Sequence, residues 1–143
     1  MITREHLLAS AREAARYAYA PYSHFPVGAA VVVETTDGPR VVSGANIENA
    51  SYSLTLCAER AALAAAQMLA PEPGTRPRIT HVAIACVAVP VDAPASQRTP
   101  CGACRQWLAE LAPDAVYYVD GIPGELHLHD LLPLAFGAPS DRL

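Results

Sequence analysis

The chain is 143 residues long, 52% of its residues are hydrophobic and 17% are charged. These figures exclude disorder throughout, because such a chain can bury enough apolar surface to fold, and we expect one domain over residues 1–143. The net charge is −4, every basic residue is an arginine, and no basic cluster is denser than Arg76 and Arg78. Nucleic acid polymers and anionic membrane surfaces attract concentrated positive charge, so neither is an expected partner.

The expected elements alternate between helices and strands. Helices are predicted where apolar residues recur at helical spacing or alanines accumulate, and strands where β-branched apolar runs lie between turns. In chain order they are helix 3–19, strand 27–35, strand 40–45, helix 57–69, strand 79–89, helix 101–111, strands 115–119 and 125–128, and a helical turn at 130–132. This order predicts an α/β fold: a three-layer α-β-α sandwich with a mixed, mostly five-stranded sheet. The step from 79 to 119 predicts a right-handed parallel crossover.

The N-terminal residues carry charges throughout, and no run of about 18 apolar residues occurs, so we expect neither a signal peptide nor a membrane span. The expected location is therefore the cytoplasm, where thiols stay reduced. In that compartment the four cysteines are more readily explained as ligands, catalytic groups or core residues than as disulfides.

Three of these cysteines stand at the starts of expected helices. Cys57 begins one helix, and Cys101 and Cys104 begin another. Helix N-termini stabilise thiolates, and residues at i and i+3 face the same side of a first turn, an arrangement that Zn²⁺ accepts. With Cys57 as a third ligand from the facing helix, one coordination position stays open, which is typical of catalytic rather than structural zinc.

Two charged residues follow Cys57 closely. Glu59 can approach the same metal only because Cys57 lies at the helix start, and from there it would carry protons to and from a metal-bound water rather than act as a ligand. Three thiolates and one Zn²⁺ sum to a charge of −1. We hypothesise that Arg60 hydrogen-bonds ligand sulfurs and offsets this charge, although it could also be a solvated helix residue.

The block Cys57-Ala58-Glu59, followed by Pro100-Cys101-Gly102-Ala103-Cys104, resembles the zinc-dependent cytidine deaminases. A Cys-x-x-Cys pair alone is a weak signal, but five ordered blocks across most of the chain are similar to the small homotetrameric nucleoside deaminases of this family. They are residues 25–30, 46–52, 55–60, 100–106 and 131–137.

The resemblance implies an enzyme of pyrimidine salvage. It implies one Zn²⁺ per subunit on Cys57, Cys101 and Cys104, and hydrolytic deamination of cytidine and 2′-deoxycytidine to uridine and 2′-deoxyuridine plus ammonia. Glu59 would carry protons from the water to N3 of cytosine and then to the departing amino group.

The resemblance also implies the substrate contacts. Phe25 would pack on the pyrimidine, Asn46 and Glu48 would hold the ribose hydroxyls, and the Ala58 backbone would contact the base. Tyr52 and Phe136 would come from neighbouring subunits of a homotetramer. Other interpretations stay open: Asn46 and Glu48 could cap turns, and the three aromatic residues could serve packing alone. His24, beside Phe25, could line the pocket mouth.

Three other functions remain possible. The enzyme could deaminate a cytosine nucleoside antibiotic such as blasticidin S, although the 46–48 block favours ordinary nucleosides. A structural module could close a four-cysteine zinc site with Cys86, which we otherwise expect as a core residue. A thiol redox protein could use Cys101 and Cys104, but would leave Cys57 and Glu59 without a role. The loop over 89–99 is longer and richer in proline than is typical of the family, and its path is not predicted.

Overall fold

The computed structural model describes residues 1–138. Its helices and strands, in chain order, are α1 (Arg4–Ala15), β1 (Val27–Thr35), β2 (Gly38–Ala45), α2 (Ala58–Ala66), β3 (Arg78–Cys86), α3 (Gly102–Leu111), β4 (Val116–Val119) and α4 (Leu128–Leu131). The strands form one mixed sheet in the order β2-β1-β3-β4. The β1–β2 and β1–β3 pairs are antiparallel, and the β3–β4 pair is parallel, which confirms the predicted parallel step.

Among the described residues the sheet has four strands, so the prediction of a mostly five-stranded sheet is wrong. The stretch predicted as a strand over 125–128 makes only an isolated bridge, between Leu126 and Tyr117. The cause lies at His127, whose backbone N–H donates to the Asp130 carboxylate at 2.8 Å and caps α4. The helix therefore starts before a strand can extend.

Other boundaries also differ from the prediction, and for two of them the structure shows the cause. Helix α1 ends at Ala15 rather than near residue 19, because Tyr19 leaves the helix to pair with Ile47. Strand β3 ends at Cys86 rather than at Val89, whose N–H donates back to the Cys86 carbonyl in a turn.

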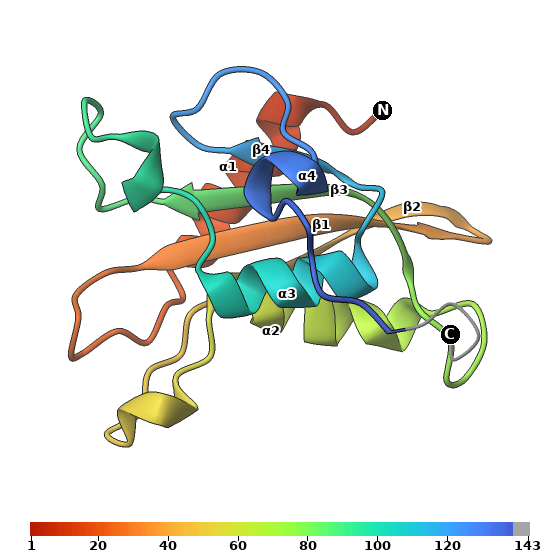
Figure 1. Ribbon diagram of the computed structural model, residues 1–143, viewed down its shortest axis with the longest axis horizontal. Helices are drawn as coiled ribbons and strands as arrows, with labels where there is room; N and C mark the ends of the chain where they lie inside the picture. The colour runs from red at the N-terminus through yellow and green to blue at the C-terminus, as the bar shows by residue number, and fades with distance from the viewer. Residues whose placement is uncertain (139–143) are drawn as a thin grey trace.

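Helices cover both faces of the sheet (Figure 1). Helix α1 buries Leu7, Leu8 and Ala11 on one face, and α2 and α3 form the larger cluster on the other. Close approach depends on two glycines: a Cβ at Gly28 would lie 1.8 Å from the Ala11 carbonyl oxygen, and one at Gly44 would lie 2.5 Å from the Ala62 nitrogen. Backbone therefore packs on backbone at both faces. None of the described helices is both long and apolar enough to cross a membrane.

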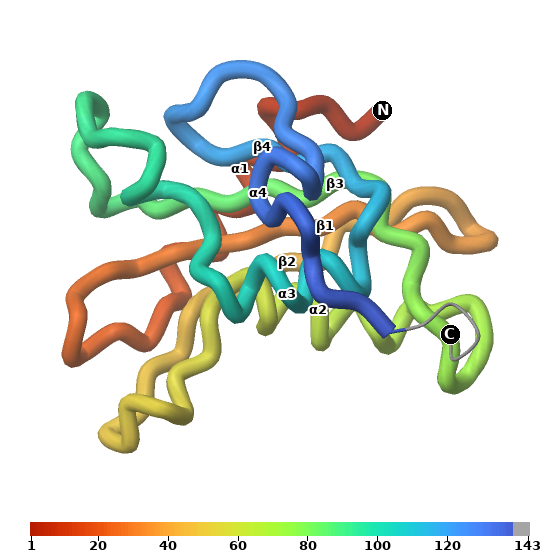
Figure 2. Tube along the Cα trace, viewed as in Figure 1, coloured from red at the N-terminus to blue at the C-terminus, as the bar shows by residue number. Residues whose placement is uncertain are grey.

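Loops from distant parts of the chain gather at one end of the sheet. Figure 2 shows the segments 20–26, 46–57 and 87–100 on the same side of the molecule. The segment 20–26 follows α1, which covers one face of the sheet, and the segment 46–57 precedes α2, which covers the other. The segment 87–100 connects β3 to α3. This end of the sheet is where the chain can enclose a pocket.

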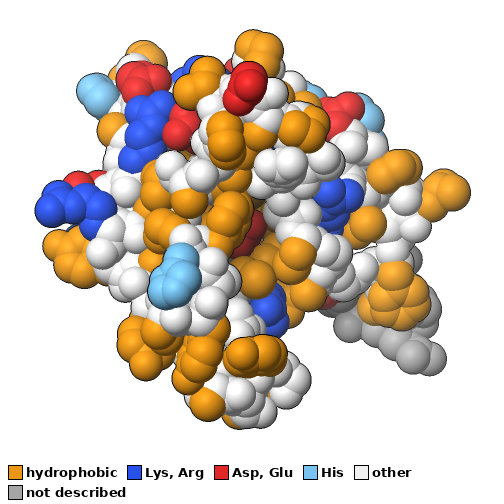
Figure 3. All heavy atoms as spheres, turned by 90° about the vertical axis from the view of Figure 1, so that its left-hand side faces the viewer, with side chains coloured by type: hydrophobic (Ala, Val, Ile, Leu, Met, Phe, Trp, Pro, Cys, Tyr) orange, Lys and Arg blue, Asp and Glu red, His pale blue; other side chains and the backbone are white. Residues whose placement is uncertain are grey.

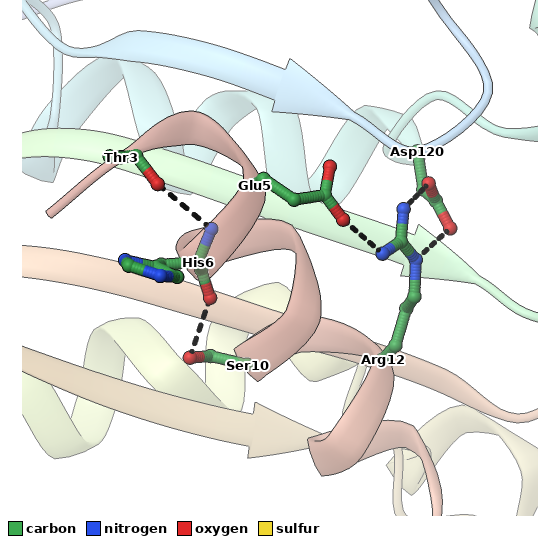
Figure 4. Close-up of polar contacts among 6 residues, drawn as sticks. All are labelled: Thr3, Glu5, His6, Ser10, Arg12 and Asp120. Carbon is green, nitrogen blue, oxygen red and sulfur yellow. Dashed lines mark hydrogen bonds and ion pairs between the residues drawn. The ribbon is translucent and has the colours of Figure 1, made fainter.

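An ion-pair cluster fixes α1 to the end of β4 (Figure 4). The Arg12 guanidinium donates to both carboxylate oxygens of Asp120, at 2.9 and 2.6 Å, and to Glu5 at 2.8 Å. At the start of the same helix, the Thr3 hydroxyl accepts from the His6 N–H as an N-cap. The hydrogen bonds from Arg12 lower the pKa of the Asp120 carboxyl below its ordinary value.

We expect Asp120→Asn to lower the free energy of unfolding by about 1 kcal/mol at pH 7, since the pair is partly exposed. A carboxyl whose pKa is lowered by folding stabilises the native state above its unfolded pKa of about 3.9, and this stabilisation is lost as the pH falls through the folded value. The difference between wild type and variant in urea unfolding should therefore shrink below about pH 4. A difference that does not change with pH would show that the charge of Asp120 is not responsible.

Candidate active site

The three predicted zinc ligands converge. Cys57 is the N-cap residue of α2, Cys101 is the N-cap residue of α3, and Cys104 lies in the first turn of α3. The Sγ atoms of Cys57 and Cys101 are 3.9 Å apart, those of Cys101 and Cys104 are 3.4 Å apart, and all three lie within 4.8 Å of one another. A tetrahedral zinc with Zn–S bonds of about 2.3 Å separates its sulfurs by about 3.8 Å, so this donor set fits Zn²⁺.

The electrostatics of the cluster also suit a cation. Hydrogen bonding by the Cys104 thiol, joined by the Arg60 guanidinium and Cys101, lowers the pKa of Cys57 to about 5. The pKa of Cys104 is raised, because its proton is shared with Cys57 and its side chain is buried. In the absence of a metal, Cys57 and Cys104 compete for one proton. A bound dication would favour the thiolate form of every ligand and so would end this competition.

Arg60 lies where the charge-compensation hypothesis needs it. Its Nη2 atom is 3.6 Å from Cys57 Sγ and 3.2 Å from the Thr55 carbonyl oxygen. The guanidinium can therefore donate to a ligand sulfur and partly offset the negative charge of the cluster.

We expect Arg60→Gln to lower kcat by roughly tenfold or more while the zinc content stays at one per chain, because the metal becomes a weaker Lewis acid beside an uncompensated thiolate. Steady-state kinetics and elemental analysis of the same preparation measure both quantities. Arg16→Gln, at an exposed position directly after α1, is the control and should leave both unchanged. Unchanged turnover in Arg60→Gln would leave Arg60 with a structural role only.

Glu59 is buried beside the cluster. Its side chain is 5% exposed, and Oε2 accepts from the Cys104 thiol at 3.6 Å. Burial, followed by the negative charge of Cys57, raises the pKa of Glu59 above its ordinary value. A carboxyl group of raised pKa that faces a cavity is suited to accept and return a proton.

A cavity of about 600 Å³ opens above these groups. It is lined by residues of the three gathered loops and by the starts of α2 and α3: Tyr22, Ser23, Phe25, Val27, Asn46, Glu48, Tyr52, Thr55, Cys57, Ala58, Glu59, Cys86, Gln97, Thr99 and Cys101. Figure 3 shows this side of the molecule, where hydrophobic side chains (orange) surround a hollow in which atoms of an acidic side chain (red) are visible. The cavity is thus apolar at its walls with a few polar groups, as is typical of small-molecule sites.

Asn46 and Glu48 line the cavity and also hold its loop. The Asn46 side chain accepts from the Val27 N–H at 2.8 Å and donates to the Phe25 carbonyl at 2.9 Å. Glu48 accepts from the backbone N–H of Tyr22 at 2.9 Å and from the backbone and hydroxyl of Ser23. The Ser23 hydroxyl lowers the pKa of Glu48. Asn46 and Glu48 therefore do make the loop contacts that the turn-capping interpretation expects. Their contacts with a sugar stay a prediction.

The predicted aromatic contacts divide into two groups. Phe25 lines the cavity, and so does Tyr52, which was expected in a neighbour's site but here lines the pocket of its own chain, edge-on to Tyr22. Phe136 is 80% exposed and lies outside this cavity; its carbonyl accepts from Gln106. His24 has a positive φ of 53° and is not among the lining residues.

Sequence reasoning missed several lining residues, including Tyr22, Ser23, Gln97 and Thr99. Their proximity to Phe25 and to Pro100-Cys101 was the available signal. Cys86 packs partly buried against the core, as expected, but also lines the cavity. Its thiol donates to the Arg98 carbonyl at 3.6 Å, and among the described residues it is not part of the sulfur cluster. The four-cysteine interpretation therefore lacks its fourth ligand.

Comparison with known proteins agrees with this geometry. The family model described as the cytidine and deoxycytidylate deaminase zinc-binding region matches residues 1–120. A cytidine deaminase of Halalkalibacterium halodurans is 44% identical over 139 residues, covering 94% of this chain and 95% of that protein. One of Mycobacterium tuberculosis is 46% identical over 131 residues, covering 92% and 87% respectively. The crystal structure of cytidine deaminase from Burkholderia pseudomallei is 40% identical, covers 94% of this chain and 100% of its own, and superimposes with a TM-score of 0.77. The chain therefore belongs to the cytidine and deoxycytidylate deaminase family, and Cys57, Cys101 and Cys104 are its zinc ligands.

Proposed function

We propose that this protein hydrolytically deaminates cytidine and 2′-deoxycytidine to uridine and 2′-deoxyuridine, with release of ammonia. The observation that carries the proposal is the buried Glu59 carboxyl group beside the three-sulfur cluster, at the end of a cavity of about 600 Å³. The relatives of 44–46% identity that are named cytidine deaminase support it.

The residues of the chain divide the chemistry among them. Cys57, Cys101 and Cys104 would hold Zn²⁺, which would supply a Lewis acid that lowers the pKa of a water molecule. Glu59 takes one proton of that water and delivers it to N3 of the cytosine ring while the water oxygen bonds to C4. It then takes the remaining proton from the new hydroxyl group on C4 and transfers it to the amino group, so that the C4–N bond breaks and ammonia leaves. Phe25 packs on the pyrimidine, and the Ala58 backbone at the start of α2 orients the base.

The sugar would lie against Asn46 and Glu48. Each side chain keeps hydrogen-bonding capacity beyond its loop contacts. The Asn46 amide has a second donor hydrogen, and the Glu48 carboxylate has about four lone-pair sites for the loop donors of Tyr22 and Ser23. The second candidate substrate class, a cytosine nucleoside antibiotic such as blasticidin S, is favoured by no contact of the cavity.

Incubation with cytidine tests the function directly. We expect loss of cytosine absorbance with one ammonia and one uridine formed per cytidine consumed, and the same with 2′-deoxycytidine. Turnover of blasticidin S without turnover of either nucleoside would replace the proposed substrate. Zinc-loaded, folded protein that converts none of the three would contradict the function.

We also propose a homotetramer in the cytoplasm, with Phe136 acting in a neighbour's pocket. Supporting this are the exposed aromatic side chains of Tyr17 (78%), Tyr52 (73%) and Phe136 (80%), since large aromatics are enriched at interfaces. If sites are shared, two inactive variants, Phe136→Ala and Glu59→Gln, should regain activity when their subunits are unfolded and reassembled together. No regain in a mixture shown by light scattering to be tetrameric would place each site within one chain.

A further inference from the structure

Arg98 is a buried charge that the proposed chemistry does not use. Four polar or charged side chains are buried among the described residues: Asn46, Glu48, Glu59 and Arg98. The first three line the cavity, whereas Arg98, at 6% exposure, does not. Burying a guanidinium is costly unless its N–H groups find acceptors, so the contacts of Arg98 show what the burial achieves.

The guanidinium of Arg98, near the end of the segment that connects β3 to α3, binds backbone near the start of that segment and backbone directly after β4. It donates to the Pro90 carbonyl, near the start of this segment, and to the Asp120 carbonyl, at the end of β4, at 3.3 Å. The backbone carbonyl of Arg98 itself accepts from the Cys86 thiol at 3.6 Å. One residue therefore ties the 87–99 loop to the ends of two neighbouring parallel strands.

Gly121 provides the surface on which the guanidinium lies. A Cβ at this position would be 2.5 Å from Arg98 Nη1 and 2.7 Å from Cζ, and the backbone here has φ +85°. Asp120, the residue before it, is fixed in turn by Arg12 and by a hydrogen bond from its N–H to the Ile84 carbonyl. The anchor point of the loop is therefore rigid.

Both sequence neighbours of Arg98 line the cavity. Gln97 and Thr99 form part of its wall, and the chain continues from Thr99 through Pro100 to the ligand Cys101. We propose that Arg98 is a positioning residue for the reaction: by clamping the 87–99 loop, it sets the pocket wall formed by Gln97 and Thr99 and thereby the affinity for the nucleoside. The proposal rests on the proposed function for its substrate.

The kinetic test uses Arg98→Lys and Arg98→Gln. The lysine keeps the charge but not the fork that reaches two carbonyls, so it should rescue little. Because Glu59 and the zinc ligands lie on or beside α2 and α3, we expect KM for cytidine to rise roughly fivefold or more while kcat changes less than about twofold. Gly121→Ala, which displaces the same guanidinium from the other side, should likewise raise KM for cytidine with little change in kcat. Arg76→Gln removes an exposed arginine that also donates to a carbonyl, that of Glu110, and is the matched control.

A double substitution separates positioning from general destabilisation. In a Gln97→Ala Thr99→Ala background the wall atoms are already absent, so Arg98→Gln should raise KM by less than about twofold further. An undiminished rise in that background would overturn the proposal. So would loss of zinc, or a fall in kcat at unchanged KM, in an Arg98→Lys protein with native circular dichroism.

A third readout does not depend on activity. Cys86 is the one cysteine outside the zinc cluster, and its thiol contacts the clamped loop. In zinc-loaded protein, Arg98→Gln should increase the rate of maleimide labelling at Cys86 by roughly tenfold, whereas Arg76→Gln should not. If cytidine is not a substrate but labelling rises, the proposed function fails while the clamp stands. If Cys86 in Arg98→Gln is labelled no faster than in the Arg76→Gln control, the proposal that Arg98 clamps the loop is contradicted, whatever the substrate.

Discussion

Glu59→Gln is expected to lower kcat for cytidine by about 10²–10⁴-fold or more, with zinc still bound. The amide fits the same buried space but can neither take a proton from water nor return it to the substrate. Because one carboxyl group serves every proton transfer of the proposed reaction, its removal should cost more than loss of a group used once. Steady-state kinetics together with the zinc content of the same sample measure the effect.

Glu110→Gln, at an exposed position on α3, is the matched control for Glu59→Gln and should behave as wild type. A second variant, Glu59→Asp, keeps the carboxyl group but withdraws it by one methylene, so an intermediate loss is expected. Near wild-type kcat in Glu59→Gln would mean that a different group moves the proton.

Cys104→Ser should abolish both zinc binding and activity. The exchange barely changes the volume of a fully buried side chain, but it replaces a thiolate with a hydroxyl group that stays protonated and is a poor zinc ligand. Two remaining sulfurs do not hold the metal at the affinity of three. Elemental analysis after dialysis, and the cytidine assay, measure the two losses.

Cys86→Ser is the control that separates the catalytic site from a closed structural one. Its thiol contacts the Arg98 carbonyl rather than the sulfur cluster, so the variant should retain one zinc per chain. Loss of zinc from Cys86→Ser would restore the four-cysteine interpretation and contradict an open coordination position.

Local chemistry explains which parts of the site could be predicted from sequence. Cys101 and Cys104 are three residues apart at a helix start, so their sulfurs must face one side whatever the rest of the fold does. The convergence of Cys57 with them is a long-range contact: the position of Cys57 at a helix start suggested it, and the resemblance to a family with ordered blocks implied it. Comparison with relatives and the distances between the three sulfurs confirm it.

The errors and gaps arise where specific hydrogen bonds override the local apolar pattern. The apolar alternation over 125–128 favours a strand, but Asp130 caps a helix at His127 and ends it. The path of the 89–99 loop depends on one guanidinium that reaches carbonyls 8 and 22 residues away. No periodicity in the sequence reports contacts of that kind. The assignment of Tyr52 and Phe136 to neighbouring subunits stays a prediction.

The double duty of Asn46 and Glu48 has a consequence for affinity. Both side chains are already oriented in the folded protein before any sugar binds, because they hydrogen-bond to backbone groups of the 22–27 segment. The entropy of ordering these groups is therefore spent before binding begins, which is preorganisation. Truncating either side chain would loosen the loop that carries Phe25 as well as remove the proposed ribose contact, so weaker binding in such a variant would combine both losses.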